Sequence, residues 1–285
     1  MIKKILLADS GTGQTKEMLS VLMELPAIQK TAVTLLHVVP PQTSADAMRT
    51  KRQEGAKTLA ASVESMHLAP NQIFCVNTML REGEPKDEVC RVAEEIDADL
   101  IIMGSRGLKR LQSILQNSVS QYVFQLSSRP MLLVKDDIYV EKLNRVMVAM
   151  SDSEAAKQCL KLAMFLLQDV KGGQLVLVHI TPELKGRGEA ITVDAEKHPV
   201  LAPAVAEAKN KGLACKCVLS TGKPGEELCR LAEAFNVDLL MLGSPDRRPS
   251  IAKSFPDLDR LLGTSLSDYV RVHAYCPVLL ARTLE

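Results

Sequence analysis

The chain has 285 residues, 46% of them hydrophobic, and 35 basic side chains nearly balance 34 acidic ones. This length can bury two cores, and the balanced charge argues against a nucleic-acid surface. Seven cysteines lack the spacing of a disulfide framework, which fits a reducing compartment. The first apolar run is too short for a signal peptide and no stretch reaches membrane-spanning length, so we expect a soluble cytoplasmic protein.

Short apolar runs alternate with longer amphipathic segments along the chain, which is the pattern of βαβ units on a parallel sheet. The strands predicted in the first half are Lys4–Ala8, Val33–Val39, Ile73–Met79, Asp99–Met103 and Met131–Val134. The helices predicted between them are Thr15–Met23, Ala45–Met66, Lys86–Ile96 and Ser118–Leu126. The strands predicted in the second half are Val146–Met150, Leu175–Ile180, Ala214–Leu219, Asp238–Leu242 and Val278–Ala281. Because the apolar runs are nearly continuous, both faces of each sheet should be covered.

The two halves repeat each other at a constant offset. Gly83-x-Pro85 recurs 139 positions later as Gly222-x-Pro224, and Gly104-Ser105 recurs at the same distance as Gly243-Ser244. Cys90-Arg91 and Asp99-Leu100 recur in the same way. A repeat this long indicates two tandem domains rather than a solenoid, and we place them at residues 1–138 and 142–285.

Five parallel strands with right-handed crossovers predict an α/β fold in each domain, a doubly wound, Rossmann-like sheet of strand order 3-2-1-4-5. In such sheets ligands bind beyond the carboxyl ends of the strands, where the strand order reverses. The loops expected to carry a site are Asp9–Thr15 and Gly104–Ser118, with Ser151–Glu154 and Gly243–Ser265 as their duplicates.

The segment after the fourth strand has the features of an anion-binding loop. It reads Gly104-Ser105-Arg106-Gly107 and, nine residues later, Asn117-Ser118-Val119-Ser120. Glycines let backbone N–H groups approach an anion, and the following helix adds further donors and a positive dipole end. The two serines of the second segment can donate hydroxyls or cap that helix, and the arginine can pair with a phosphate. A tight turn followed by a helix N-cap would produce the same sequence pattern without any ligand.

Several separated motifs together resemble the universal stress protein family in its tandem form. They are the run DLIIMGSRG, the G-x2-G-x9-(G)-S spacing, Leu36-His37-Val38, the Gly83-x-Pro85 turn, and the closing strands RPMLLV and CPVLLA. The resemblance covers essentially the whole chain. It implies a regulatory protein of the stress response that binds ATP or AMP, with or without Mg²⁺, and has no dedicated catalysis beyond slow incidental ATP hydrolysis.

The resemblance also implies which residues of the first domain bind the nucleotide. Asp9 and Val38 would flank the adenosine, and Asp9 is placed to accept a hydrogen bond from a sugar hydroxyl or base edge. The full predicted site is Asp9, Val38, Met103, Gly104, Arg106, Gly107, Asn117, Ser118, Val119 and Ser120. Two departures are that Asn117 replaces the family's third glycine and that ADSGTG replaces the usual VDGSE.

The second domain has lost parts of the same pattern. Ser151 stands where the family has its acid, and Pro245-Asp246 replaces the segment that contains the second glycine. Proline removes a donor and aspartate repels phosphate, so we predict that this domain does not bind ATP. An insertion over residues 245–262 carries apolar side chains that could cover the crevice or contact a partner.

Two other functions remain open at this point. Ser10-Gly11-Thr12-Gly13-Gln14-Thr15 matches the flavodoxin phosphate loop, which would indicate FMN, although the chain has no Trp and only four Tyr to stack on a flavin. A nucleotide-free scaffold or chaperone-like protein that binds an apolar or lipid-like ligand is the other alternative. No P-loop motif G-x4-G-K-[ST] is present, so Walker-type ATPase chemistry is not supported.

Three further interpretations concern isolated residues and partners. His37 and His179 occupy equivalent places after the second strands, and we interpret both as structural. Cys215-x-Cys217 is the only close cysteine pair, and without a second pair we interpret it as two residues on one strand face rather than a zinc site. The family resemblance implies that the domains pair through Met131–Val134 and Val278–Ala281, and we expect protein partners and a possible homodimer, but no nucleic acid or membrane.

Overall fold

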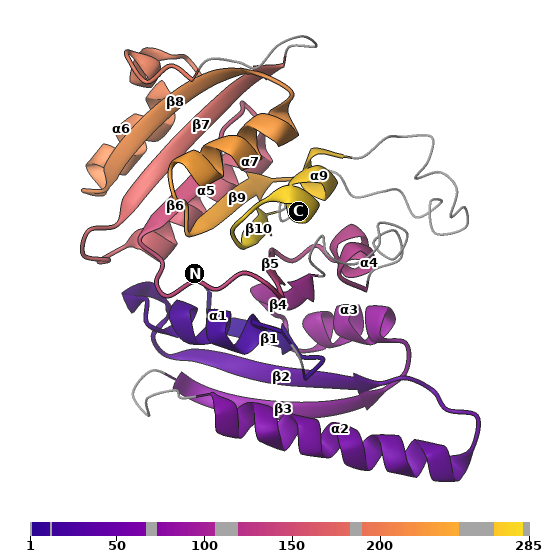
Figure 1. The fold of residues 1–285 in the computed structure, drawn as a ribbon. Helices are drawn as coiled ribbons and strands as arrows, with labels where there is room; N and C mark the ends of the chain where they lie inside the picture. Colours follow the sequence, from indigo (N-terminus) through magenta and orange to yellow (C-terminus); the bar gives the residue numbers. More distant parts are fainter. Residues whose placement is uncertain are drawn as a thin grey trace. The chain divides into compact units, whose positions relative to one another are not determined.

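A computed structural model of the chain describes residues 2–11, 13–66, 73–105, 119–182, 190–244 and 265–281 (Figure 1). The chain divides into two compact units, Met1–Glu141 and Lys142–Glu285. Each unit is an α/β domain that alternates strands and helices, as the sequence pattern predicts.

The first unit follows the predicted element order. Its strands are β1 (Lys4–Ala8), β2 (Thr31–Val39), β3 (Ile73–Glu82), β4 (Leu100–Ser105) and β5 (Met131–Lys135). Its helices are α1 (Thr15–Met23), the short η1 (Pro26–Ile28), α2 (Ala45–Ser65), α3 (Pro85–Glu95) and α4 (Val119–Leu126).

The second unit repeats this order with its own helix lengths. Its strands are β6 (Arg145–Ala149), β7 (Gln174–Pro182), β8 (Ala214–Gly222), β9 (Leu239–Gly243) and β10 (Val278–Ala281). Its helices are α5 (Glu154–Leu167), the short η3 (Ala195–Lys197), α6 (Ala202–Asn210), α7 (Pro224–Ala234) and α9 (Leu266–His273).

Both units contain a parallel, doubly wound sheet. The strand order is β3-β2-β1-β4-β5 in the first unit and β8-β7-β6-β9-β10 in the second. The predicted order 3-2-1-4-5 is therefore confirmed in both. Because β1 lies between β2 and β4, the order reverses there, and the carboxyl ends of these strands open a crevice where ligands bind in such sheets.

Strand burial explains why the apolar runs are continuous. Ile5, Leu6 and Leu7 of β1 are fully buried although neighbouring side chains point to opposite faces, so both faces of the sheet are covered. The right-handed crossovers place α1 and α2 on one face and α3 and α4 on the other, because the two pairs of connections run in opposite directions along the sheet. Helices α3 and α4 pack together, as do their counterparts α7 and α9.

Two of the repeated sequence motifs have structural roles. A carboxylate oxygen of Asp99 accepts the backbone N–H groups of Lys3 and Lys4 at 2.7 and 2.9 Å, and Asp238 does the same for Asn144 and Arg145 at 2.9 and 2.7 Å. The repeated glycines, at positions 83 and 222, have φ of 146° and 132°, which suits glycine, and each precedes a helix that begins with proline. The repeated residues therefore fix the beginnings of equivalent strands and helices in the two units.

The long helix α2 has a polar sequence, and only Gly55, Leu59 and Ser62 among its residues are buried. Across the described residues, no helix combines the length and the apolar character that crossing a membrane requires.

Candidate functional site

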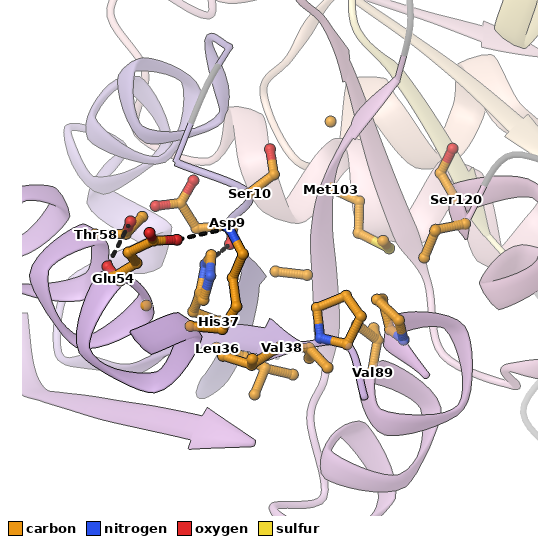
Figure 2. Close-up of a pocket in the computed structure, with 18 of the residues that line it drawn as sticks. Asp9, Ser10, Leu36, His37, Val38, Glu54, Thr58, Val89, Met103 and Ser120 are labelled. Carbon is orange, nitrogen blue, oxygen red and sulfur yellow. Dashed lines mark hydrogen bonds and ion pairs between the residues drawn. The ribbon is translucent and has the colours of Figure 1, made fainter. Parts of the chain in front are cut away.

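A cavity of about 610 Å³ lies in the first unit at the carboxyl ends of β1, β2 and β4 (Figure 2). Its position is the crevice that the strand order predicts. Its size falls in the range typical of small-molecule sites. Helix α2 and the first turn of α4 complete its wall.

Asp9 directly follows β1 and is only 4% exposed. One carboxylate oxygen accepts the backbone N–H of Gly11 at 2.9 Å, and the other accepts the hydroxyl of Ser62 in α2. These bonds connect the β1–α1 loop to α2. A carboxylate has about four acceptor positions, so Asp9 retains capacity toward a ligand hydroxyl in the cavity that it lines.

His37 lies beside Asp9, as Figure 2 shows. Its Nδ1 donates to the carbonyl oxygen of Asp9 at 2.9 Å. His37 therefore makes a hydrogen bond of the kind that a structural histidine makes, and the same ring also lines the cavity. Because Nδ1 carries the proton in this bond, Nε2 of the neutral ring is an acceptor.

The apolar side of the cavity is formed by the end of β2 and by its surroundings. Val38 lies in this wall together with Leu36 and with Val89 of α3 (Figure 2). Gly55 allows α2 to pack closely there, since a Cβ at this position would lie 2.9 Å from Leu80 Cδ1 and 3.0 Å from His37 Cδ2. A flat apolar wall next to hydrogen-bonding groups suits a nucleobase and its sugar.

The opposite side of the cavity is formed by β4, by α4 and by Asp136 after β5. Among the described residues, a Cβ built at Gly104 would meet Thr15 Cγ2 at 3.8 Å and Asp136 Oδ1 at 4.0 Å, which are ordinary contact distances. Val119 and Ser120 place the N-terminus of α4 at the cavity, where the positive end of the helix dipole favours an anion.

The carboxylates of the described wall outnumber its cations. Asp9, Glu54 and Asp136 line the cavity, and the ammonium of Lys51, also in the wall, pairs with Glu54 at 2.6 Å. The lysine of the described wall is therefore already paired with a carboxylate, and Arg106, predicted to pair with a phosphate, lies outside the described residues. Among the described residues no group of three His, Cys, Asp or Glu could hold a metal ion.

The structure brings six of the ten predicted site residues to this one cavity: Asp9, Val38, Met103, Gly104, Val119 and Ser120. The other four, Arg106, Gly107, Asn117 and Ser118, lie outside the described residues. The roles of all ten residues as nucleotide ligands stay predictions.

The sequence reasoning missed the contribution of α2 and of Asp136. Lys51, Glu54, Gly55 and Thr58 all line the cavity. The one available signal was Gly55, since a glycine inside a helical pattern often marks close packing.

In the second unit, the counterpart of Asp9 is Met150, which corrects the assignment of Ser151. Asp9 N–H donates to Leu36 O at 2.9 Å, and Met150 N–H donates to Val178 O at 2.7 Å. His179 Nδ1 donates to the carbonyl oxygen of Met150 at 2.9 Å, as His37 does to Asp9. An apolar thioether therefore replaces the carboxylate.

The two loops place their helices differently. Six residues separate β1 from α1, but only four separate β6 from α5. In the longer loop Gly11 and Gly13 have φ of 82° and 90°, values that glycine adopts without strain. In the second unit the first turn of α5 instead lies directly on Gly243, where an added Cβ would be 2.4 Å from the Ala155 carbonyl carbon and 2.5 Å from the Ala156 nitrogen. The space that Gly104 faces in the first unit is therefore filled in the second.

The other side of the crevice is also filled in the second unit. The ring of His198, which follows η3, stacks on His179 with centroids 4.9 Å apart and an interplanar angle of 29°. The equivalent ring in the first unit, His37, lines the open cavity. The insertion at 245–262, which we considered as a cover, lies outside the described residues.

Fold and site together define a protein of two doubly wound α/β domains, and the described residues of the first form an open crevice. The profile of the universal stress protein family matches the chain twice, over residues 1–135 and 142–282. The chain therefore belongs to the universal stress protein family, and the tandem form that the motifs resemble is confirmed.

Individual relatives agree with this assignment. Universal stress protein YxiE of Bacillus subtilis is 29% identical over 151 residues, which cover 47% of this chain and 100% of the relative. Universal stress protein Sll1654 of Synechocystis is 30% identical over 137 residues, which cover 47% of this chain and 86% of the relative. The crystal structure of a universal stress protein from Archaeoglobus fulgidus has 22% identity and a TM-score of 0.73, and the likeness covers 98% of this chain and 96% of that chain. At that identity the likeness supports the fold alone.

Proposed function

We propose that the first unit binds an adenine nucleotide, ATP or AMP, as a regulatory ligand in a stress response, and that the second unit does not. The observation that carries the proposal is the difference between two equivalent crevices. The first is an open cavity of about 610 Å³, and in the second the α5 backbone covers Gly243 and His198 covers His179. Family membership supports the stress-related role.

The described residues suggest how the ligand would be held. Asp9 would accept a ribose or base hydrogen bond, Val38 would contact the base, and Gly104 would leave room for the phosphates beside the α4 N-terminus. Binding would favour one conformation of the protein over others and so change the surface offered to partners in the cytoplasm. The sequence has no Walker motif, and we propose no dedicated catalysis.

Calorimetric titration of the full chain with AMP, and with ATP in the presence and absence of Mg²⁺, tests the proposal. We expect saturable binding with one nucleotide per chain. Absence of binding by both nucleotides would contradict the proposal and favour the scaffold alternative. A flavin absorption band in the visible spectrum of the purified protein would instead favour FMN.

Substitution of Asp9 should separate its ligand role from its structural role. In Asp9→Asn the side-chain carbonyl can still accept from Gly11, and the amide can donate to Ser62. We expect a nearly unchanged melting temperature but an affinity about tenfold weaker, because a charged acceptor is lost from the ligand bond. Asp9→Ala should also destabilise the protein, by about 2 kcal/mol, since it leaves two donors unpaired.

Calorimetry and thermal melting of both variants give the two readouts. If Asp9→Asn binds AMP as tightly as the unmodified chain, Asp9 holds the loop and does not contact the ligand.

A further inference from the structure

The edge strand of the second unit carries two thiols next to each other. Cys215 and Cys217 lie two positions apart on β8, so their side chains share one face of the sheet. Both are free, and their sulfur atoms are 4.0 Å apart. Cys217 is buried at 8% exposure, whereas Cys215 is partly exposed. The strand therefore holds the two thiols side by side, and solvent has access to the pair at Cys215.

The sulfur separation fits a bridging metal ion. With metal–sulfur bonds of about 2.3 Å, an ion that contacts both sulfurs lies off the line between them, at a sulfur–metal–sulfur angle of about 120°. This angle is that of a trigonal site with one further position open. The partly exposed side of Cys215 would be where an external ligand completes it.

The number of protein side chains available as ligands indicates which class of metal ion could bind. Among the described residues no third His, Cys, Asp or Glu joins the pair to make a metal-binding group, so the four ligands of a structural zinc site are not available. Soft thiolate ligands favour Cu(I), which does not need four protein ligands. The ammonium of Lys209 acts electrostatically on both sulfurs in favour of thiolates, and the carboxylate of Glu196, which pairs with this ammonium at 2.9 Å, acts in the opposite sense.

A disulfide between the same residues fits the strand less well. Two residues apart on a strand, the Cα atoms are separated by about 6.6 Å, near the upper end of the range for disulfides. The sulfurs would also have to approach from 4.0 Å to bonding distance. Closing the bond would disturb the pairing of Cys215 with Leu175 and of Cys217 with Leu177.

We propose that Cys215 and Cys217 form a two-thiolate binding site for a soft monovalent metal ion, Cu(I), on the edge of the second unit. The site is separate from the nucleotide cavity of the first unit, and it assigns a ligand to the unit whose crevice is closed. No change of oxidation state is required, because the ion enters as Cu(I) and each thiol releases its proton.

The test is a competition titration with Cu(I), using the reduced full-length protein under anaerobic conditions and bathocuproine disulfonate as the competing chelator. We expect one Cu(I) per chain to transfer to the protein. Cys215→Ser should weaken the binding by about 100-fold or more, because a single thiolate cannot chelate. Cys75→Ser is the matched control, since Cys75 is an exposed free thiol on a strand of the first unit, and it should bind as the unmodified chain does.

Cys217→Ser should have the same effect, but Cys217 is buried and its variant could lose structure, so the partly exposed Cys215 gives the deciding result. Circular dichroism checks that each variant is folded. Equal Cu(I) affinity in Cys215→Ser and the unmodified chain would overturn the proposal, as would no Cu(I) transfer to the unmodified chain. Retention of Zn²⁺ in preference to Cu(I) would overturn the assignment of the ion.

Discussion

Replacing Gly104 by leucine is expected to abolish nucleotide binding and to leave the first unit folded. Within the part of the chain that the structure describes, a Cβ at Gly104 meets nothing closer than Thr15 Cγ2 at 3.8 Å, so we expect the larger side chain to extend into the cavity. It would occupy the space that we assign to the phosphates. The expected loss of affinity for AMP and ATP is about 100-fold or more, corresponding to about 2.7 kcal/mol.

Calorimetric titration measures this loss, and thermal melting shows whether the fold persists. Gly104→Ala is the matched control: its single methyl group lies at an ordinary contact distance, so we expect a much smaller loss of affinity. Full affinity in the leucine variant would show that the ligand does not approach Gly104.

The equivalent substitution in the second unit, Gly243→Leu, is expected to destabilise the protein and to leave nucleotide affinity unchanged. A Cβ there would lie 2.4 to 2.6 Å from backbone atoms of Ala155 and Ala156, and a helix backbone cannot move aside as a side chain can. Overpacking of this kind should destabilise the second unit by about 3 kcal/mol. The melting temperature should then fall by roughly 10 °C.

Denaturation of Gly243→Leu, compared with Gly104→Leu, measures the difference between the two crevices. Nucleotide affinity of the folded Gly243→Leu protein should match that of the unmodified chain, because the cavity belongs to the first unit. A stable Gly243→Leu variant with weakened nucleotide binding would contradict both assignments.

The sequence pattern predicted the strands and helices well, because short apolar runs mark the buried strands and longer amphipathic segments mark the helices between them. Lys4–Ala8, Thr15–Met23 and Val278–Ala281 were predicted to the residue. The apolar pattern was less informative where a strand ends in polar residues. The strand predicted to end at Met79 continues to Glu82, because Val38 and Val39 of β2 pair with Arg81 and Glu82. Backbone pairing with a neighbouring strand does not require apolar side chains, so it leaves no hydrophobic pattern in the sequence.

The parts of the site that the sequence did not predict depend on contacts between distant residues. Ser62 bonds to Asp9 across 53 positions, and no spacing rule connects a helix residue to the end of a strand so far away. Met150 is identified as the counterpart of Asp9 by its backbone hydrogen bond to the neighbouring strand, which the sequence alone does not show. The stacking of His198 on His179 likewise joins residues 19 positions apart, which no spacing rule connects.

The central claim is that the first unit alone offers an open crevice to adenine nucleotide, and hydrogen exchange followed by mass spectrometry tests it most directly. In the presence of saturating AMP, we predict slower amide exchange in residues 8–11, 36–40 and 100–105, with no change in 149–153, 178–181 and 239–244. Protection confined to the second set of segments would contradict the claim.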